Sequence, residues 1–501
     1  MAGLSLGYVG LLLQLATSLA LTPILLRELG QTTWGFWLVA QQLLGYVGLM
    51  DLGVLGLLPR EVPVAVAQGQ LPRLLGKTVR LMFIQLPLIT CASAVAWWLA
   101  PAPDATFRPA LAVLLLAFTT LAPMRLFALL LEGLQDLGFL GVAQLSGWVV
   151  GTAISAAGVL CGFGLMALAV GWASTQLVTA ALCAGRLWRR HAGVLPRKLE
   201  RVPLGEAWAY VKKGLWLTAA RTAQPLIHGT DLLVLGQARG AAAVVPYNCT
   251  DKLVTVFGNQ PSMVLQTAGP GLSELRARGE HQRLAHVRLA LTHAVLLLAG
   301  GLGCVVLACN PGFVSWWIGA EQFGGMALTA LLVAKMMLRQ WNVSLSYAVF
   351  FVGYERRLTF TSLADGALTV GATMGLVRWL GPLGAPLGSL LGVCLVSLPV
   401  LLVTLAREER RPVHALITPL WPVAWRLAIA CGLAAAVGRW LPPHGFFQLV
   451  VWGAIGSGAY LAWMFPVMTR EPLSGYLLPR WEALAARLQR LLPSGLRPSG
   501  G

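Results

Sequence analysis

The chain has few charged residues, and it lacks the short motifs that mark many enzymes and ATP-driven pumps. Only 11% of its 501 residues are charged, against roughly 25% in soluble domains. The eight cysteines form no CxxC pair and the seven histidines no HxxxH pair, which argues against a zinc site or a disulfide framework. No GxxxxGK[ST] phosphate loop is present, so we expect no ATP-driven transport by this chain alone. We therefore expect a protein that is not an enzyme and has no catalytic residues, no metal and no cofactor.

Apolar residues are abundant, at 57% of the chain, and they occur in long runs. About 20 apolar residues cross a membrane as a helix. Runs of that length, bounded by charges or by Pro and Gly, fall at 8–26, 34–58, 78–100, 109–131, 139–160, 163–185, 208–235, 242–268, 287–309, 325–352, 358–379, 383–406, 420–441 and 445–468. We therefore predict an all-α polytopic membrane protein with about 14 transmembrane helices.

The excess of positive charge, +18, is explained by orientation in a membrane and does not indicate a nucleic-acid partner. Lys and Arg collect in cytoplasmic loops, and here they cluster in every second connection between the runs. The basic connections lie at 60–80, 186–213, 276–288, 356–357, 407–426 and from 470 onward. This alternation predicts that both termini are cytoplasmic, and it supports the even number of spans.

The two halves of the chain resemble each other. Leu29-Gly30-Gln31 recurs as Leu235-Gly236-Gln237, and Ala67-x-Gly69-x-x-x-Arg73-Leu74 recurs as Ala277-x-Gly279-x-x-x-Arg283-Leu284. Matches in the same order favour a duplicated six-helix unit with two helices added. We predict an N-terminal six-helix lobe at 1–185, a basic cytoplasmic linker at 186–206, a C-terminal six-helix lobe at 207–406, two additional transmembrane helices at 407–468, and a cytoplasmic tail at 469–501.

Polar side chains recur at helical spacing inside several predicted spans, which places them on one face of each helix. Ionisable residues in a span usually face the bundle interior or a wet cavity. The cations within or at the ends of spans are Arg60, Arg125, Arg221, Lys252, Lys335 and Arg339, and the anions are Asp51, Asp231, Asp251 and Asp365. The balance predicts a cationic lumen for an anionic substrate group such as a pyrophosphate.

Of these cations, Arg221, Lys335 and Arg339 are the substrate ligands that spacing favours. The alternative is that each cation neutralises a nearby acid and holds helices in register. Asp251, Asp365 and His228 are candidates for coupling transport to an ion gradient, and His228 in particular could act as a proton-linked switch.

Two stretches are similar to bacterial polysaccharide-unit (O-antigen-type) flippases of the multidrug/oligosaccharidyl-lipid/polysaccharide exporter superfamily. The resemblance rests on Leu29-Gly30, Trp34-Gly35-x-Trp37, Tyr46, Asp51-Leu52-Gly53 and Arg60 in the first half, and on Asp231 to Gly236, Tyr247, Lys252, Pro270-x-Leu272 and Arg283 in the second. It implies two six-helix lobes in the bacterial inner membrane. It also implies that Arg60 and Lys252 are head-group ligands.

The resemblance further implies a function. Such a flippase moves an undecaprenyl-pyrophosphate-linked oligosaccharide from the cytoplasmic to the periplasmic leaflet for polysaccharide biosynthesis. Its partners would be this lipid-linked substrate and the bilayer, with a polysaccharide polymerase or glycosyltransferases as candidate protein partners. Two alternatives remain at this point: an ion-coupled multidrug exporter of the same superfamily, and a membrane glycosyltransferase or polymerase. The exporter branch typically has an acid within its first helix, where this chain has none before Glu28.

Overall fold

The part of the chain that the structure describes is almost entirely helical. The structure, a computed structural model, describes residues 2–51, 54–100, 107–192 and 229–475, together with residues 203, 205, 208, 219, 222–223 and 225–227. Residue contacts divide the chain into two compact units, Met1–Val245 and Pro246–Gly501. The predicted linker at 186–206 falls partly outside the described residues, so the predicted domain boundaries stay predictions.

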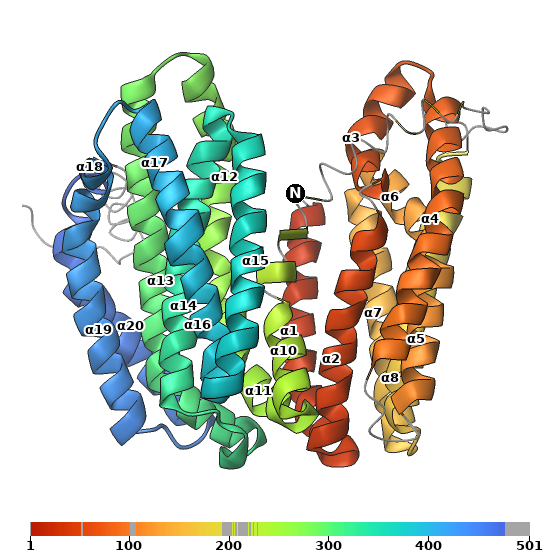
Figure 1. The fold of residues 1–501 in the computed structure, drawn as a ribbon, viewed down its shortest axis with the longest axis horizontal. Helices are drawn as coiled ribbons and strands as arrows, with labels where there is room; N and C mark the ends of the chain where they lie inside the picture. Colours follow the sequence, from red (N-terminus) through yellow and green to blue (C-terminus); the bar gives the residue numbers. More distant parts are fainter. Residues whose placement is uncertain are drawn as a thin grey trace, which may run out of the picture. The chain divides into compact units, whose positions relative to one another are not determined.

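Unit 1 contains helices that cover the first six predicted spans (Figure 1). They are α1 (Ala2–Leu29), α2 (Gln31–Val47), η1 (Gly48–Asp51), α3 (Val54–Ala67), α4 (Leu71–Leu99), α5 (Phe107–Leu121), η2 (Ala122–Met124), α6 (Arg125–Gly133), α7 (Leu137–Leu160) and α8 (Gly164–Arg190), followed by α10 (Thr230–Arg239) and η3 (Ala241–Ala243). The seventh predicted span, 208–235, lies largely outside the described residues.

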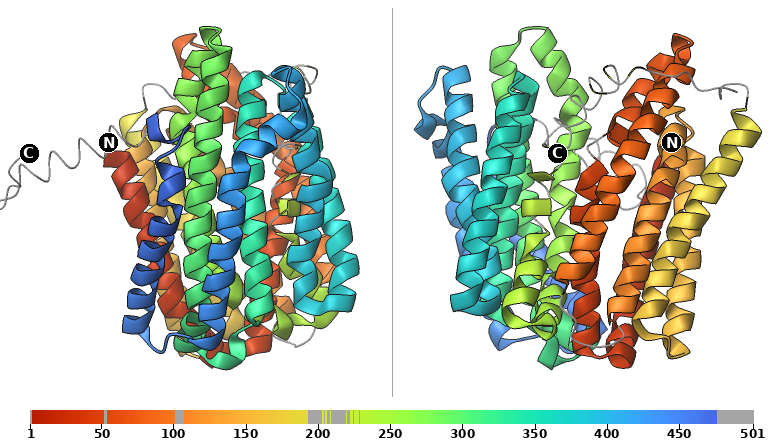
Figure 2. Two further views of the ribbon diagram at one scale, coloured as in Figure 1. Left: turned by 90° about the vertical axis from the view of Figure 1, so that its left-hand side faces the viewer. Right: turned by 45° about the vertical axis from the view of Figure 1, so that its right-hand side comes forward.

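Unit 2 begins within α11 and contains the remaining predicted spans. Its elements are α11 (Val244–Gly258), α12 (Gln260–Ala277), α13 (His281–Ile318), η4 (Ala320–Gln322), α14 (Met326–Val352), α15 (Glu355–Leu380), η5 (Gly381–Leu383), α16 (Gly384–Gly392), the π-helical turn η6 (Val393–Ser397), α17 (Leu398–Glu408), α18 (Val413–Ile417), η7 (Thr418–Leu420), α19 (Trp421–Trp440) and α20 (Phe446–Met468). The long α13 packs against α12, α14, α19 and α20 (Figure 1 and Figure 2).

Eight segments of the described residues are both long and apolar enough to cross a membrane. Large apolar side chains such as Trp379, Phe447 and Leu433 are exposed on the helices, as expected where a helix faces lipid and not water. The prediction of an all-α polytopic membrane protein is confirmed.

Glycine lets helices approach closely in both units. On α16, Gly384, Gly388 and Gly392 recur every four residues, and a Cβ at Gly388 would lie 2.3 Å from Thr373 Oγ1 of α15. On α7, a Cβ at Gly151 would lie 2.4 Å from a backbone oxygen of Gly171 on α8. Small residues at this spacing are a common way to bring membrane helices together. These contacts fix the α7–α8 and α15–α16 pairs.

Short turns join many of the helices in one recurring way. At Gly69, Gly162, Gly279 and Gly353 the helix ends on a glycine with positive φ, and the next amide donates to the carbonyl five residues back. This is the Schellman ending, which favours glycine because a Cβ is strained there. Of the described residues other than glycine, Gln135 and Arg410 alone have positive φ, and they end α6 and α17 in the same way.

Some glycine turns of the two halves share backbone geometry. Gly30 (φ 75°, ψ 163°) separates α1 from α2, and Gly240 (φ 85°, ψ 160°) separates α10 from η3. The turns at Gly69 and Gly279 are also 210 residues apart. Glycines of a similar conformation precede other helices as well, at Gly325 and Gly445, so the predicted duplication stays a prediction.

Candidate functional site

The candidate site in unit 1 is a cavity of about 610 Å³ between α2, α5, α6 and α8. Its described lining comprises Gln41, Leu44, Gly45, Gly48, Leu49, Phe118, Leu121, Ala122, Arg125, Trp172, Gln176 and Pro225. Among these residues Arg125 carries the one formal charge, and Gln41, Trp172 and Gln176 supply neutral polar groups. The described part of the lining is therefore cationic and offers additional hydrogen-bonding groups.

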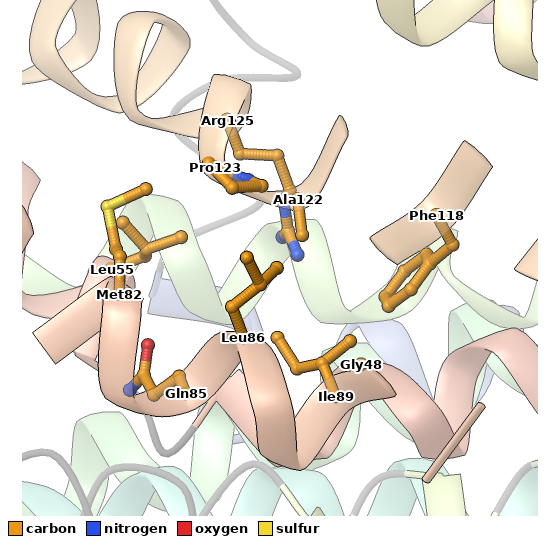
Figure 3. Close-up of a pocket in the computed structure, with 10 residues that line it drawn as sticks. All are labelled: Gly48, Leu55, Met82, Gln85, Leu86, Ile89, Phe118, Ala122, Pro123 and Arg125. Atoms are coloured by element: carbon orange, nitrogen blue, oxygen red, sulfur yellow. The ribbon is translucent and has the colours of Figure 1, made fainter. Parts of the chain in front are cut away.

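The chain brings Arg125 into this cavity by a break in the fourth predicted span. Pro123 lies in the 3₁₀ turn η2 between α5 and α6, because proline cannot donate the amide hydrogen bond that a continuous helix needs. Arg125 is the first residue of α6, directly after the break. Figure 3 shows its side chain running past Ala122 toward Leu86 and Phe118, which line a smaller hollow of about 20 Å³ with Arg125.

Arg125 is exposed to the cavity, and the described residues offer its guanidinium no ion-pair partner. An arginine that lies between apolar spans without a carboxylate is costly unless water or an anionic ligand solvates it. This is the property expected of a ligand for a phosphate or carboxylate group. The sequence analysis counted Arg125 among the deep cations but did not name it as a ligand, although Pro123 two residues earlier was a signal for a break.

The predicted site residues of unit 2 include a buried ion pair. Arg339 on α14 and Asp365 on α15 are 5% and 0% exposed. Arg339 Nη1 donates to Asp365 Oδ2 at 2.5 Å, and Nη2 donates to Oδ1 at 3.0 Å. Arg339 also donates to Ser389 of α16, and Asp365 accepts from Ser397 and Thr369. Every oxygen of Asp365 and every nitrogen of Arg339 thus has a protein partner.

This ion pair corresponds to the alternative in which a cation neutralises a nearby acid. The polar stripe of the eleventh predicted span, with Asp365, Thr369 and Thr373, is buried against the glycines of α16. To bind a substrate, Arg339 would have to exchange its bonds with Asp365. The assignments of Arg339 to substrate and of Asp365 to ion coupling therefore stay predictions.

The other predicted residues of unit 2 lie on α11 and α14. Asp251 and Lys252 are half-buried on α11, and Asp251 Oδ2 accepts a hydrogen bond from Thr255 at 2.8 Å. Lys335 is half-buried on α14, one turn before Arg339. Gln340 of α14 donates to the carbonyl of Gly258 at the end of α11, so the two helices are joined near these cations.

Three predicted residues cannot be described as ligands. Arg221 and His228 lie outside the described residues. Arg60 lies on the described helix α3, but its side chain also lies outside the described part. Their roles stay predictions.

A polar network that the sequence analysis did not identify joins α11, α13 and α14. Asn310 Nδ2 donates to the carbonyl of Thr250 at 3.0 Å and to Thr329 Oγ1 at 3.1 Å. Thr250 Oγ1 accepts from the amide of Gly324 at 2.8 Å. Asn310 and Thr329 are fully buried. Such bonds anchor membrane helices to each other, so we assign this network a structural role.

Comparison with known proteins identifies a similar fold but assigns the chain to no family. No family model matches the chain, and no curated protein matches it. Among solved structures, the chain is similar to the lipid II flippase MurJ in an inward closed conformation, with a TM-score of 0.60, 8% identity, and coverage of 93% of this chain and 100% of that one. It is also similar to a multidrug resistance MATE family transporter of the MOP superfamily in an inward-facing conformation, with a TM-score of 0.57, 14% identity, and coverage of 83% and 98%. The chain has the fold that these two proteins share.

Proposed function

We propose that the protein is a flippase that moves an undecaprenyl-pyrophosphate-linked oligosaccharide from the cytoplasmic to the periplasmic leaflet of a bacterial inner membrane. The observation that carries this proposal is Arg125, exposed in a cavity of about 610 Å³ without a carboxylate among the described lining residues. A pyrophosphate supplies the negatively charged partner that no described lining residue provides for Arg125. A guanidinium can bind phosphate oxygens in a bidentate way. The fold shared with the lipid II flippase MurJ is consistent with a lipid-linked substrate.

The proposed mechanism separates the two parts of the substrate. The sugar-pyrophosphate head occupies the cationic lumen, while the polyprenyl chain stays in the bilayer. Arg125 lowers the cost of bringing phosphate charge into a region of low dielectric constant. Arg60, Arg221, Lys252 and Lys335 stay predicted ligands, and Arg339 could act as one only by giving up its bonds with Asp365. Alternating access to the two leaflets then transfers the head across the membrane.

The second candidate is an ion-coupled multidrug exporter, and the fold shared with the MATE family transporter favours it. The substrates of the two functions differ in charge, and Arg125 favours only one sign of charge. A guanidinium that has no carboxylate partner among the described residues attracts an anionic head group and repels a cationic drug by the same Coulomb interaction. The charge of the transported molecule therefore separates the two functions.

Reconstitution into proteoliposomes tests the proposal. A polyprenyl-pyrophosphate oligosaccharide with a fluorescent sugar is placed in one leaflet, and its appearance in the other is followed with a membrane-impermeant quencher. The proposal predicts flipping of the intact lipid. Efflux of a cationic dye without lipid flipping would support the exporter, and covalent transfer of the sugar would support a glycosyltransferase or polymerase.

A further inference from the structure

Unit 2 contains a second cavity, separate from the cavity around Arg125. It has a volume of about 430 Å³ and lies between α12, α13, α14 and α17. Figure 1 shows the hairpin between α12 and α13 and the last turn of α17 at the same end of this unit. A hollow of about 380 Å³ adjoins it and shares Gln282, Ala285, Arg288, Glu409 and Arg411 with it. The space is in the size range of small-molecule sites.

One side of this cavity is apolar and the other is basic. The apolar wall consists of Leu265, Leu272, Leu284, Leu291, Ala348, Phe351, Val352 and Leu405. The basic rim consists of Arg276, Arg288, Arg410 and Arg411, and two acids, Glu408 and Glu409, also line the space. The four cations and two anions of the described lining leave a net charge of +2. An occupant that matches both sides has a negative head and an apolar tail.

The two acids of the rim have partners within unit 2. Glu409 forms an ion pair with Arg288 at 2.8 Å, with both side chains largely buried. Glu408 accepts a hydrogen bond from Tyr354 at 3.0 Å. The Nε of Arg288 is buried, and the described residues offer it no hydrogen-bond acceptor. This buried Nε is out of reach of a ligand in the cavity, and the exposed side chains of Arg410 and Arg411 supply the donors that an anionic ligand can use.

Arg410 adds an argument from backbone conformation. Its φ is 51°, in the left-handed region, where a side chain costs about 1 kcal/mol or more relative to glycine. The equivalent turns at Gly69, Gly279 and Gly353 use glycine. This chain instead keeps a cationic side chain at a strained position on the rim. Gln135 shows that a residue other than glycine also occurs at such a turn outside this cavity, so the argument for ligand binding rests on the positive charge of Arg410 and its place on the rim.

We propose that this cavity binds an anionic phospholipid of the bilayer, with its phosphate at the arginine rim and an acyl chain along the apolar wall. Basic pockets between membrane helices at the cytoplasmic side are suited to anionic lipid heads, and the positive-inside pattern predicts that this end is cytoplasmic. Free phosphate would leave the apolar wall uncovered, and a zwitterionic lipid would bring no net charge to the rim. The site does not depend on which substrate the protein transports.

The test uses the purified full-length protein and measures retained lipid by native mass spectrometry. The probes are phosphatidylglycerol, phosphatidylcholine with the same acyl chains, polyprenyl phosphate, and glycerol phosphate without a chain. We expect phosphatidylglycerol to bind and the other three to bind at least about tenfold more weakly. Equal retention of phosphatidylcholine, equal binding of glycerol phosphate, or preference for polyprenyl phosphate would each overturn the proposal.

Two double variants, one inside the cavity and a matched control outside it, test where the phospholipid binds. The double variant Arg276→Gln/Arg411→Gln should weaken phosphatidylglycerol binding roughly 25-fold, at about fivefold for each basic residue near an anionic lipid. The control Arg278→Gln/Arg407→Gln removes the same charge from the same end of unit 2, but neither residue lines the cavity, so binding should change less than about twofold. An equal loss in both double variants would indicate general surface attraction and overturn the proposal.

Arg410→Gly separates lipid binding from folding. Glycine relieves the strain at this helix end, so thermal stability without lipid should be equal or higher. Binding of phosphatidylglycerol should still fall about fivefold. A variant that is stable and binds the lipid as tightly as the wild type would contradict a role for the Arg410 side chain.

Discussion

Replacing Asp365 by Asn should destabilise unit 2 strongly. The change removes the negative charge that Arg339 contacts at 2.5 Å and 3.0 Å and leaves a guanidinium that is 5% exposed. Breaking a buried ion pair by removing one partner costs about 3–5 kcal/mol, because an uncompensated charge stays buried. We expect the free energy of unfolding in mixed micelles to fall by that amount.

A control with the same chemistry is available on the surface. Arg278 and Glu274 also form an ion pair at 2.5 Å, but both side chains are 62% exposed. Glu274→Gln should therefore change the free energy of unfolding by no more than about 1 kcal/mol. The double variant Arg339→Met/Asp365→Leu should lose less than Asp365→Asn alone, because it leaves no charge in the interior. Equal stability of Asp365→Asn and Glu274→Gln would refute the argument from burial.

Two further outcomes follow from the contacts of the fold. Gly392→Ala should destabilise the α15–α16 pair, because its Cβ would lie 2.4 Å from Asp365 Oδ1, whereas Gly371→Ala, with nothing within 4 Å, should be nearly neutral in thermal unfolding. The hydrogen bond from Arg186 Nε, at 2.9 Å, holds the pKa of Asp136 below its usual range. The ionised Asp136 carboxylate therefore stabilises the fold above about pH 4, and this stabilisation is lost as the pH falls through the lowered pKa. Below about pH 4 the difference in melting temperature between the wild type and Asp136→Asn should therefore shrink as the pH falls, and a difference that stays unchanged down to about pH 2 would contradict this.

The membrane spans could be predicted from the sequence because their length is set by the thickness of the hydrocarbon layer. Apolar runs of about 20 residues coincide with α7 and α20 almost to the residue. By contrast, α4 begins at Leu71, well before its predicted span at 78–100, and α13 extends beyond its predicted span, 287–309, at both ends. Local breaks were less visible. The run at 109–131 was predicted as one span, and the 3₁₀ turn at Ala122–Met124 divides it. Hydropathy does not change at such a break, because the break depends on the backbone of one proline and not on the polarity of the side chains around it.

The partners of the polar residues could not be predicted in the same way. Helical spacing predicted polar stripes that contain Arg339 and Asp365 on two different spans. It could not show that the stripes face each other, because that depends on how closely the glycines of α16 let α15 approach. Arg125 presents the opposite case. A deep cation was identified from the sequence, and only the structure showed that no described acid neutralises it.

The flipping rate of Arg125 variants tests the central claim most directly. The measurement compares proteoliposomes that contain equal amounts of the wild type, Arg125→Gln, Arg125→Lys and, as a control in the same pair of helices, Arg108→Gln, which does not line the cavity. A charge-assisted hydrogen bond contributes about 1.5–3 kcal/mol. The account therefore predicts that Arg125→Gln lowers the flipping rate of the polyprenyl-pyrophosphate oligosaccharide roughly 10- to 100-fold, that Arg125→Lys retains an intermediate rate, and that Arg108→Gln flips like the wild type. Wild-type flipping by Arg125→Gln at normal abundance would contradict it.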